Sequence, residues 1–356
     1  MTPERSRGPA QALGVRPAPG TSPGLAEPMP GGSSTAPVFI AGPDRSGTTL
    51  MFALLASRPN LSMVRRTNMW RYFHRRYGDL GDPENLERCL RDMVRYRRMQ
   101  HLQPDVDRIR MEFAQGEPTY GRLFSLFHEH NAQRAGKSRW GDKSLHTEHY
   151  ADRVLSEFSE ARILHMVRDP RDRYASVRKR WDRDVSRVGA ATGRWLSSTR
   201  AGRRNQRRHP DRYLMVRYED LATDPELTMQ RVCAFIGEDY SAEMLTMSGV
   251  PEQKDRAGNS SFGDVEPGSI STRAIGRFRT VLSPSELAFI QLVAGRELSA
   301  MGYERAETHL TSRTRLRFYA LELPVQLMSM IGWVSLAWFH RRRGVRVPAS
   351  KIDDGS

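Results

Sequence analysis

A short apolar strand that leads through a glycine-containing loop into a helix start is the feature that most constrains the fold of this chain. Residues 38–41 read VFIA and residues 42–49 read GPDRSGTT. Gly42 and Gly47 match the two glycines of the phosphate loop GxxxxGK[ST], in which backbone N–H groups at a helix N-terminus hold an anion. The run predicts an α/β fold with an anion site at the carboxyl end of its first strand. An ordinary strand, turn and hydroxyl-capped helix is the alternative at this point.

The loop lacks the lysine of a nucleoside-triphosphate enzyme. Thr48 stands at the lysine position, and the nearest cation, Arg45, lies inside the loop. In the complete motif the lysine reaches the β- and γ-phosphates, and the next hydroxyl holds Mg²⁺. One arginine and two threonine hydroxyls suit a compact oxyanion better than a magnesium-bound triphosphate. The sequence therefore disfavours a P-loop kinase or NTPase, which is the first competing hypothesis.

Two more apolar runs predict buried strands of a parallel sheet. Residues 163–167 and 213–216 are each followed by a turn and a helix signal. Helix starts are expected near Pro170, Pro225 and Pro284, because each proline follows an aspartate or serine that can cap a first turn. This alternation of strands and helices is typical of α/β domains with a parallel sheet.

The segments between these strands divide into helices and loops. Residues 84–99 and 120–134 have partial apolar faces and are predicted to be helices. Residues 183–212 are rich in arginine, and residues 252–272 are rich in Gly, Ser and Asp. Both of these segments are predicted to be surface loops or lids.

A second basic loop follows the strand predicted at residues 163–167. Arg168 leaves the carboxyl end of this strand, where open α/β sheets bind ligands. Ser176 comes eight positions later, about two helical turns along, where its hydroxyl can face an anion held by Arg168. Alone, such a pair is more often a surface arginine and a solvated hydroxyl. Together with the loop at 42–47, it predicts a nucleotide with two separated anionic groups.

These two sites, in this order, resemble the sulfotransferases that use 3′-phosphoadenosine 5′-phosphosulfate (PAPS). In that family a PRSGTT or PKSGTT loop binds the 5′-phosphosulfate, and an arginine with a serine eight residues later binds the 3′-phosphate. The resemblance continues through WGDKS at 140–144, VRYEDL at 216–221 and IGRF at 275–278. It defines a sulfotransferase domain at residues 37–303, similar to the bacterial branch related to carbohydrate and tyrosyl-protein sulfotransferases. It implies a P-loop-like three-layer α/β fold with a central parallel sheet flanked by helices.

The resemblance also implies which residues bind the donor PAPS. Arg168 and Ser176 would bind the 3′-phosphate, and Tyr218 matches a family position that contacts adenine. An aromatic residue that closes a strand in the core is the alternative for Tyr218. Arg273 and Arg277 are expected to close over the cofactor. The residues implied to bind the 5′-phosphosulfate are Arg45, Ser46, Gly47, Thr48 and Thr49.

The catalytic residues on the acceptor side are less clearly marked. The family implies in-line transfer without a metal, with Arg45 stabilising the transition state. Lys143 matches a family lysine, although Ser-Leu replaces the usual Thr-Pro after it. The glutamate that several members carry is missing, since residues 63–70 read MVRRTNMW. His146 is the candidate general base, because an imidazole suits proton abstraction, and Asp142 is the alternative.

Charge and cysteine content restrict the partners of the chain. Its 56 basic and 41 acidic residues give a net charge of +15 and a pI of about 10.3, which indicates polyanionic partners. A basic nucleic-acid-binding protein is the second competing hypothesis, but no nucleic-acid motif accompanies the arginine runs, so no nucleic acid is expected. Cys89 and Cys233 lie outside any CxxC pattern, and no metal site is predicted. The absence of an apolar signal region favours a cytoplasmic location.

The two ends of the chain differ in character from the domain between them. Residues 1–36 are rich in Pro, Gly and Ser and are predicted to be a disordered tail. Residues 304–356 form a basic extension around the uncharged apolar segment 323–339. This segment predicts an interfacial helix that lies on an anionic membrane surface, with a buried helix that caps the core as the alternative. The expected acceptor is a glycan, a lipid-linked molecule or a small molecule.

Overall fold

The computed structural model describes residues 35–180, 187–250, 268–345, 347–348 and 351–352. The predicted tail at 1–36 lies almost wholly outside the described residues, as does most of the predicted loop at 252–272.

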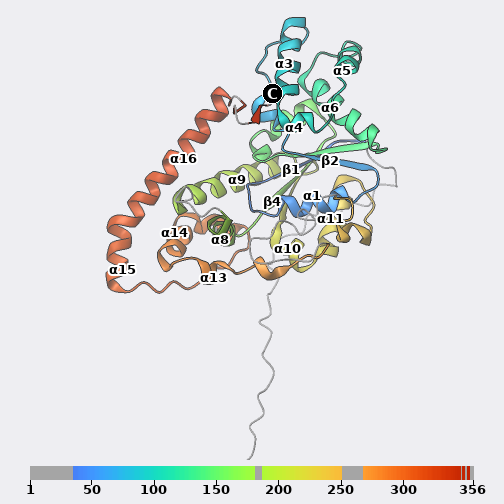
Figure 1. Ribbon diagram of the computed structural model, residues 1–356. Coiled ribbons are helices and arrows are strands. Elements are labelled where there is room, and N and C mark those ends of the chain that lie inside the picture. Colours follow the sequence, from blue (N-terminus) through green and yellow to red (C-terminus); the bar gives the residue numbers. More distant parts are fainter. Residues whose placement is uncertain (1–34, 181–186, 251–267, 346, 349–350, 353–356) are drawn as a thin grey trace, which may run out of the picture.

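A five-stranded sheet forms the centre of the domain (Figure 1). The strand order is β2-β3-β1-β4-β5, and every neighbouring pair is parallel. The strands are β1 (Val38–Ala41), β2 (Leu61–Arg65), β3 (Arg139–Lys143), β4 (Arg162–Val167) and β5 (Tyr213–Arg217). Because the strands are parallel, the loops after β1, β3 and β4 leave the same edge of the sheet side by side.

Helices cover both faces of this sheet. The helices on one face are α1 (Thr48–Ala56) and α11 (Pro225–Ile236). The other face is covered chiefly by α6 (Tyr120–Arg134), α7 (Ala151–Glu157) and α9 (Val188–Arg208). The fold is therefore the predicted α/β arrangement of a central parallel sheet between helical layers.

The remaining helices and turns surround these layers. The helices are α2 (Met69–Tyr72), α3 (Pro83–Arg95), α4 (Arg97–Gln100), α5 (Val106–Phe113), α8 (Pro170–Arg180), α10 (Tyr218–Thr223), α13 (Phe278–Val281), α14 (Pro284–Ala300), α15 (Ser312–Arg317) and α16 (Leu323–Arg343). Three 3₁₀ turns and one π-helical turn complete the described elements. The 3₁₀ turns are η1 (Thr147–His149), η2 (Ala242–Thr246) and η3 (Thr272–Ala274), and the π-helical turn is η4 (Phe318–Glu322).

Strand β1 shows why its sequence is apolar throughout. Val38 and Ile40 pack into the core beneath α1 and α11, whereas Phe39 and Ala41 pack into the core on the opposite face. A parallel strand buried on both faces needs apolar side chains at successive positions instead of alternating ones. This is the reason that the run at 38–41 is a reliable signal for a central strand.

The strands and helix starts expected from the sequence are largely those of the structure. The runs at 38–41, 163–167 and 213–216 are β1, β4 and β5, and helices start at Pro170, Pro225 and Pro284. Asp224 accepts a hydrogen bond from the N–H of Leu227, and Ser283 forms a capping box with Glu286. Strands β2 and β3 were not predicted, because LSMVR and RWGDK carry polar residues that hide their strand character.

The prediction of a loop at residues 183–212 is wrong over most of its length. Residues 188–208 form the 21-residue helix α9, in which Trp195 is fully buried. One side of α9 carries buried small and apolar residues, while arginines such as Arg200, Arg203 and Arg207 lie on the solvent side. The arginine content therefore marked one face of an amphipathic helix.

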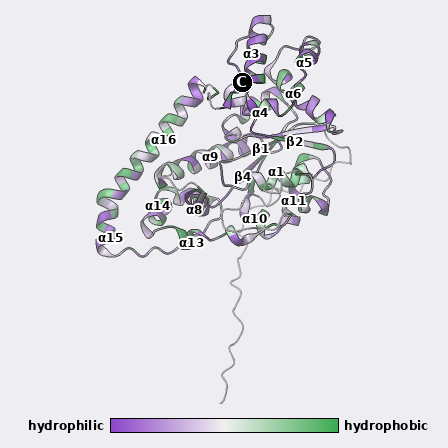
Figure 2. Ribbon diagram, viewed as in Figure 1, coloured by the Kyte–Doolittle hydropathy of each residue, from purple (hydrophilic) through white to green (hydrophobic). Residues whose placement is uncertain are grey.

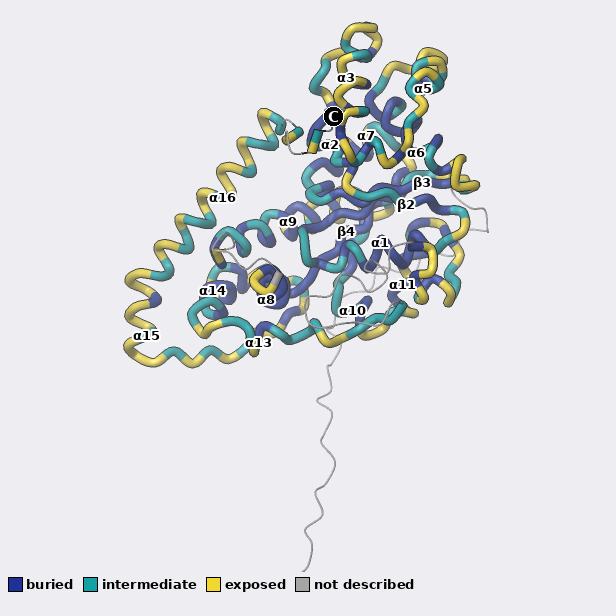
Figure 3. Tube along the Cα trace, viewed as in Figure 1, coloured by how far each residue is buried: buried dark blue, intermediate teal, exposed yellow. Residues whose placement is uncertain are grey.

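The C-terminal segment forms a long helix that packs along α9 (Figure 1). The side-chain oxygen of Gln326 in α16 accepts a hydrogen bond of 3.1 Å from the N–H of Gly189 in α9. No residue of α16 is buried, although the helix is largely apolar (Figures 2 and 3). Among the described residues, the continuous helix 312–343 is long and apolar enough to cross a membrane by length and composition. The alternative of a buried helix that caps the core is therefore excluded, and membrane contact stays a prediction.

Candidate functional site

The loop between β1 and α1 has the backbone conformation of an anion-binding turn. Gly42 has φ 120° and Gly47 has φ 89°, values that favour glycine. A Cβ atom on Gly42 would lie 2.4 Å from the carbonyl oxygen of Met166, so the loop is pressed against β4. The N–H of Gly42 donates to the carboxylate of Glu148 at 3.1 Å. The loop then leads directly into α1, whose N-terminus favours negative charge.

Several buried polar atoms in and beside the loop have no hydrogen-bond partner among the described residues, and one of them is Oδ2 of Asp44. Two of the donors among them are the hydroxyl of Ser46, which is fully buried, and the Nε–H of Arg168. Buried polar groups normally have partners, because an unpaired group costs about 1–3 kcal/mol. Unpaired donors at a helix N-terminus fit a bound oxyanion, which could accept their hydrogen bonds.

The structure brings Arg45, Arg168 and Ser176 together. Nε of Arg45 donates to the hydroxyl oxygen of Ser176 at 2.9 Å. Arg168 donates from Nη1 to the carbonyl oxygen of Arg45 at 3.2 Å. Trp195 fixes the start of this segment by donating from its indole N–H to the carbonyl oxygen of Arg168 at 2.8 Å. The two predicted anion sites are thus parts of one cluster.

Tyr218 joins the same cluster from the end of β5. The guanidinium carbon of Arg168 lies 4.5 Å from the centre of the Tyr218 ring, within the range of a cation–π contact. A Cβ atom on Gly47 would lie 2.7 Å from this ring, so Tyr218 also borders the phosphate loop. Burial raises the pKa of the Tyr218 hydroxyl, which keeps it protonated. The ring therefore offers a flat surface between the two predicted anion sites.

The segment that carries Arg273 and Arg277 lies over Arg168. Nη2 of Arg168 donates to the carbonyl oxygen of Ala274 at 2.6 Å. The carboxylate of Asp172 accepts the N–H groups of Gly276 at 2.6 Å and Phe278 at 2.8 Å. The side chain of Arg273 is exposed, and Nε of Arg277 donates to the carbonyl oxygen of Arg273. The structure thus places the backbone of this segment at the cluster, with the two arginine side chains further out.

Lys143 supplies a cation beside the loop that lacks its own lysine. Nζ of Lys143, at the end of β3, lies 3.3 Å from the hydroxyl oxygen of Thr49. Because β3 is the neighbour of β1, the side chain reaches the loop from the adjacent strand. Lys143, Thr48 and Thr49 all line one cavity, whose volume is about 680 Å³.

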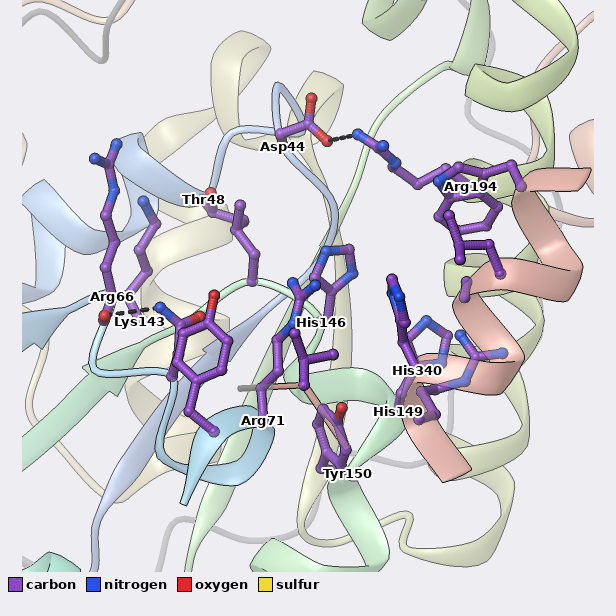
Figure 4. Close-up of a pocket in the computed structure, with 18 of the residues that line it drawn as sticks. Asp44, Thr48, Arg66, Arg71, Lys143, His146, His149, Tyr150, Arg194 and His340 are labelled. Carbon is purple, nitrogen blue, oxygen red and sulfur yellow. Dashed lines mark hydrogen bonds and ion pairs between the residues drawn. The ribbon is translucent and has the colours of Figure 1, made fainter. Parts of the chain in front are cut away.

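His146 lines the same cavity and lies below the loop in the view of Figure 4. Its backbone has φ 71°, which turns the chain sharply after β3. Burial lowers the pKa of His146 to about 4, so the imidazole is unprotonated at neutral pH and can accept a proton. Asp142 lies elsewhere: its side chain is buried beside Thr67 and Ser144 and is not part of the cavity lining. Burial raises the pKa of Asp142 to about 6.

The imidazole is one of three neighbouring groups of metal-ligand type. One ligand atom from each of His146, Glu148 and His149 lies within 4.8 Å of the others. Glu148 already holds the phosphate loop through Gly42, however, and the surrounding side chains are mostly basic. The group is better explained as a support for the loop than as a metal site.

Several basic residues of the cavity were not singled out in the sequence. Arg66 and Arg71 follow β2, whose strand character the sequence hides, and Arg194 lies on α9. Arg194 and Arg173 form ion pairs with Asp44 at 3.0 and 2.7 Å. Burial alone would raise the pKa of Asp44, but the two guanidinium groups, with Arg173 the nearer, hold this pKa well below its usual range. Recognising β2 and α9 would have indicated these positions.

Helix α16 forms the wall of the cavity that faces the phosphate loop. It contributes Trp333, Leu336, Ala337, His340 and Arg341 (Figure 4). The guanidinium carbon of Arg194 on α9 lies 5.3 Å from the centre of the Trp333 ring, which ties this wall to the body of the domain. The cavity therefore has one side formed by the loop after β1 and a more apolar side formed by α16.

A parallel α/β sheet with a glycine-containing loop before its first helix, an arginine–serine cluster at the same edge and an adjoining cavity is typical of nucleotide-dependent transferases. Residues 37–242 match the model of the sulfotransferase family. This is more than half of the chain, and the chain belongs to that family of enzymes. The family and enzyme class predicted from the sequence are confirmed.

Individual relatives show the same relation. The chain is 33% identical to carbohydrate sulfotransferase 2 of mouse and of human over 109 residues. These residues make up 30% of this chain and a fifth of the length of each relative. The sulfotransferase domain of the Synechococcus olefin synthase is similar in fold, with TM-score 0.51, 21% identity, and coverage of 78% of this chain and 98% of that domain. The sulfotransferase domain from the curacin biosynthetic pathway gives TM-score 0.50 at 19% identity, over 77% of this chain and all of that domain.

Proposed function

We propose that this enzyme transfers a sulfuryl group from PAPS to a hydroxyl or amine of an acceptor by in-line displacement. The observation that carries the proposal is the joined cluster of Arg45, Arg168 and Ser176 beside the phosphate loop. A donor with a 5′-phosphosulfate and a 3′-phosphate would satisfy both halves of this cluster at once. A P-loop kinase or a nucleic-acid-binding protein would leave the second half without a role.

The donor residues follow from their positions in the cluster. The phosphate loop, with Ser46, Thr48 and Thr49, would hold the phosphosulfate through backbone N–H groups and hydroxyls. Arg168 and Ser176 would hold the 3′-phosphate, where the planar guanidinium suits two parallel hydrogen bonds to one anion. The Tyr218 ring would stack on the adenine between them.

The transfer step needs charge stabilisation more than covalent help from the protein. The bond between sulfur and the 5′-phosphate oxygen breaks, a bond between sulfur and the acceptor oxygen or nitrogen forms, and 3′-phosphoadenosine 5′-phosphate (PAP) leaves. Arg45 and Lys143 would stabilise the charge that spreads over the transferring oxygens. The acceptor proton passes to the unprotonated imidazole of His146, with Asp142 as the second candidate.

The acceptor belongs to a glycan, a lipid-linked molecule or a small molecule that fits the cavity between the loop and α16. The basic residues of the cavity and the apolar helix beside it support a polar acceptor group near a membrane surface. We place the enzyme in the cytoplasm, peripheral to an anionic membrane through α16. The proposed membrane contact rests on the apolar surface of α16 and on the arginines at both ends of this helix.

Thermal unfolding in the presence of three ligands tests the proposed donor. PAP is compared with ATP plus Mg²⁺ and with duplex DNA, each over a range of concentrations. PAP at about 100 times its Kd is expected to stabilise the folded protein by about 2.7 kcal/mol, while the other two ligands leave the melting temperature unchanged. Stabilisation by ATP alone or by DNA alone would overturn the proposal.

A further inference from the structure

A second cavity lies between α9 and α16, next to the candidate transfer site. Its volume is about 710 Å³. The residues that give it an apolar wall are Gly193, Leu196, Ala201, Met330, Ile331 and Val334. His149 and Arg341 line both this groove and the transfer cavity, so the two spaces are adjacent at these side chains.

The close approach of the two helices shapes this groove. A Cβ atom on Gly189 of α9 would lie 1.9 Å from the carbonyl oxygen of Gln326, and one on Gly193 would lie 2.8 Å from Cγ of Met330. These glycines allow backbone contact along one line of α16. The transfer cavity lies on one side of that line, where Trp333 and Leu336 project, and the groove lies on the other.

The outer surface of α16 is apolar as well. Met328, and Leu321 in the adjoining turn η4, are each more than half exposed, and Trp338 is nearly so. A helix at the surface of a soluble protein normally turns a charged face to water. Arginines at 313, 315 and 317 and at 341–343 lie at the two ends of this apolar stretch. This arrangement is typical of a helix that lies on an anionic lipid surface.

The charges at the groove are of one sign. Arg204, Arg207 and Arg341 line it together with Arg200, whose Nε is paired with Glu297 at 2.6 Å. Among the described residues that line the groove, none is acidic. An occupant with an apolar chain and a negatively charged head would therefore match both the wall and the rim.

We infer that the acceptor is an anionic amphiphilic lipid, and this inference rests on the proposed sulfuryl transfer. Its apolar chain lies in the groove between α9 and α16. Its charged, hydroxylated head lies in the cavity beside the phosphate loop. The lipid reaches this position from the membrane surface on which α16 lies. The groove therefore selects acceptors by their chain, and the basic rim selects them by charge.

Binding of a fluorescent fatty acid to the full chain tests the groove without a membrane. cis-Parinaric acid, which has an anionic head and an 18-carbon chain, is titrated below its micelle concentration. We expect saturable binding at one site. Myristoyl lysophosphatidylglycerol should displace it at a concentration at least about tenfold lower than myristoyl lysophosphatidylcholine, which has the same chain length and no net charge. Glycerophosphoglycerol, which has the head without a chain, should not displace it.

Two variants on the same helix locate the chain. Val334→Asp puts a charge into the groove and should weaken binding of the fatty acid at least about tenfold. Met328→Asp puts the same charge on the outer surface, where Met328 is 64% exposed, and should leave binding in solution unchanged. Met328→Asp should instead reduce partitioning onto phosphatidylglycerol vesicles. Melting curves of both variants show whether they are folded.

The outcomes separate this inference from the proposed function. Absence of saturable fatty-acid binding, equal binding by the two variants, or equal displacement by the two lysolipids would each overturn the lipid acceptor. If PAP still stabilises the wild-type protein in that case, the donor assignment stands. If PAP has no effect while the groove binds the fatty acid as described, the proposed function fails and the groove remains a lipid site of another kind.

Discussion

Replacement of Gly47 by alanine tests the nucleotide site most sharply, because the chain offers a matched control in Gly136. Gly47 has φ 89° and Gly136 has φ 64°, so an alanine at either position has a left-handed backbone. This conformation costs an L-residue about 1–2 kcal/mol. A Cβ atom on Gly136 meets nothing within 4 Å, whereas one on Gly47 meets Cδ2 of Tyr218 at 2.7 Å.

Both variants should therefore lose stability through the backbone, and Gly47→Ala should lose more because of its contact with Tyr218; only Gly47→Ala should lose ligand binding. Each should melt a few degrees below the wild-type protein, since 1 kcal/mol corresponds to about 2 °C for a chain of this size. Gly47→Ala must also displace the Tyr218 ring, which packs over Arg168 at 4.5 Å. This displacement disturbs the surface between the two anion sites, so Gly47→Ala should lose most of its affinity for PAP.

Differential scanning fluorimetry with and without PAP measures both effects. The wild-type protein and Gly136→Ala should be stabilised by PAP to the same extent, by about 2.7 kcal/mol at 100 times the Kd. Gly47→Ala should show little or no PAP-dependent shift at the same concentration. An equal shift in Gly47→Ala and Gly136→Ala would refute the view that the loop and Tyr218 form one nucleotide site.

Four further predictions concern single side chains. His146→Ala should lower turnover about 10²- to 10⁴-fold without weakening PAP binding, whereas Asp142→Ala should leave turnover unchanged. Near wild-type turnover in His146→Ala would exclude His146 as the general base. Because burial lowers the pKa of His146 to about 4, wild-type turnover should stay level from pH 8 to pH 6 and fall only as the pH approaches 4, which initial rates in a buffer series would measure. Lys143→Met should reduce turnover about 10- to 100-fold, through lost charge stabilisation, and a rate within twofold of wild type would contradict its role. Burial raises the pKa of Glu219 to about 7 from 4.5, so the charged carboxylate opposes folding progressively between these pH values and fully above pH 7. Glu219→Gln should therefore melt at a higher temperature than the wild-type protein at pH 8 and at nearly the same temperature at pH 5. A difference in melting temperature that did not change with pH would argue against the burial of a charge as its cause.

The donor side of the site could be predicted from the sequence because its residues follow strongly apolar strands. The runs that precede Gly42 and Arg168 are buried on both faces, and the loops after them must leave the same edge of the sheet. The spacing of Arg168 and Ser176 is local and survives folding unchanged. The contact between Ser176 and Arg45, 131 positions apart, then follows from the pairing of β1 with β4.

The acceptor side could not be predicted in the same way. Lys143 is the last residue of β3, and Arg66 follows β2. The polar sequences of these two strands conceal their strand character. The wall opposite the loop comes from residues 333–341 of α16, which are more than 280 positions away from Gly47 in the chain. Its position depends on glycines of α9 that admit the helix backbone, and no local pattern shows such a contact.

The central claim is that Arg168 and Ser176 recognise a 3′-phosphate while the loop holds the 5′ end of the same nucleotide. Titration calorimetry with PAP and with adenosine 5′-phosphate, which lacks only that phosphate, tests it directly. Charge-assisted hydrogen bonds contribute about 1.5–3 kcal/mol, so the account predicts that PAP binds at least about 10- to 100-fold more tightly and that Ser176→Ala narrows this difference. Equal affinities of the wild-type protein for the two nucleotides would contradict it.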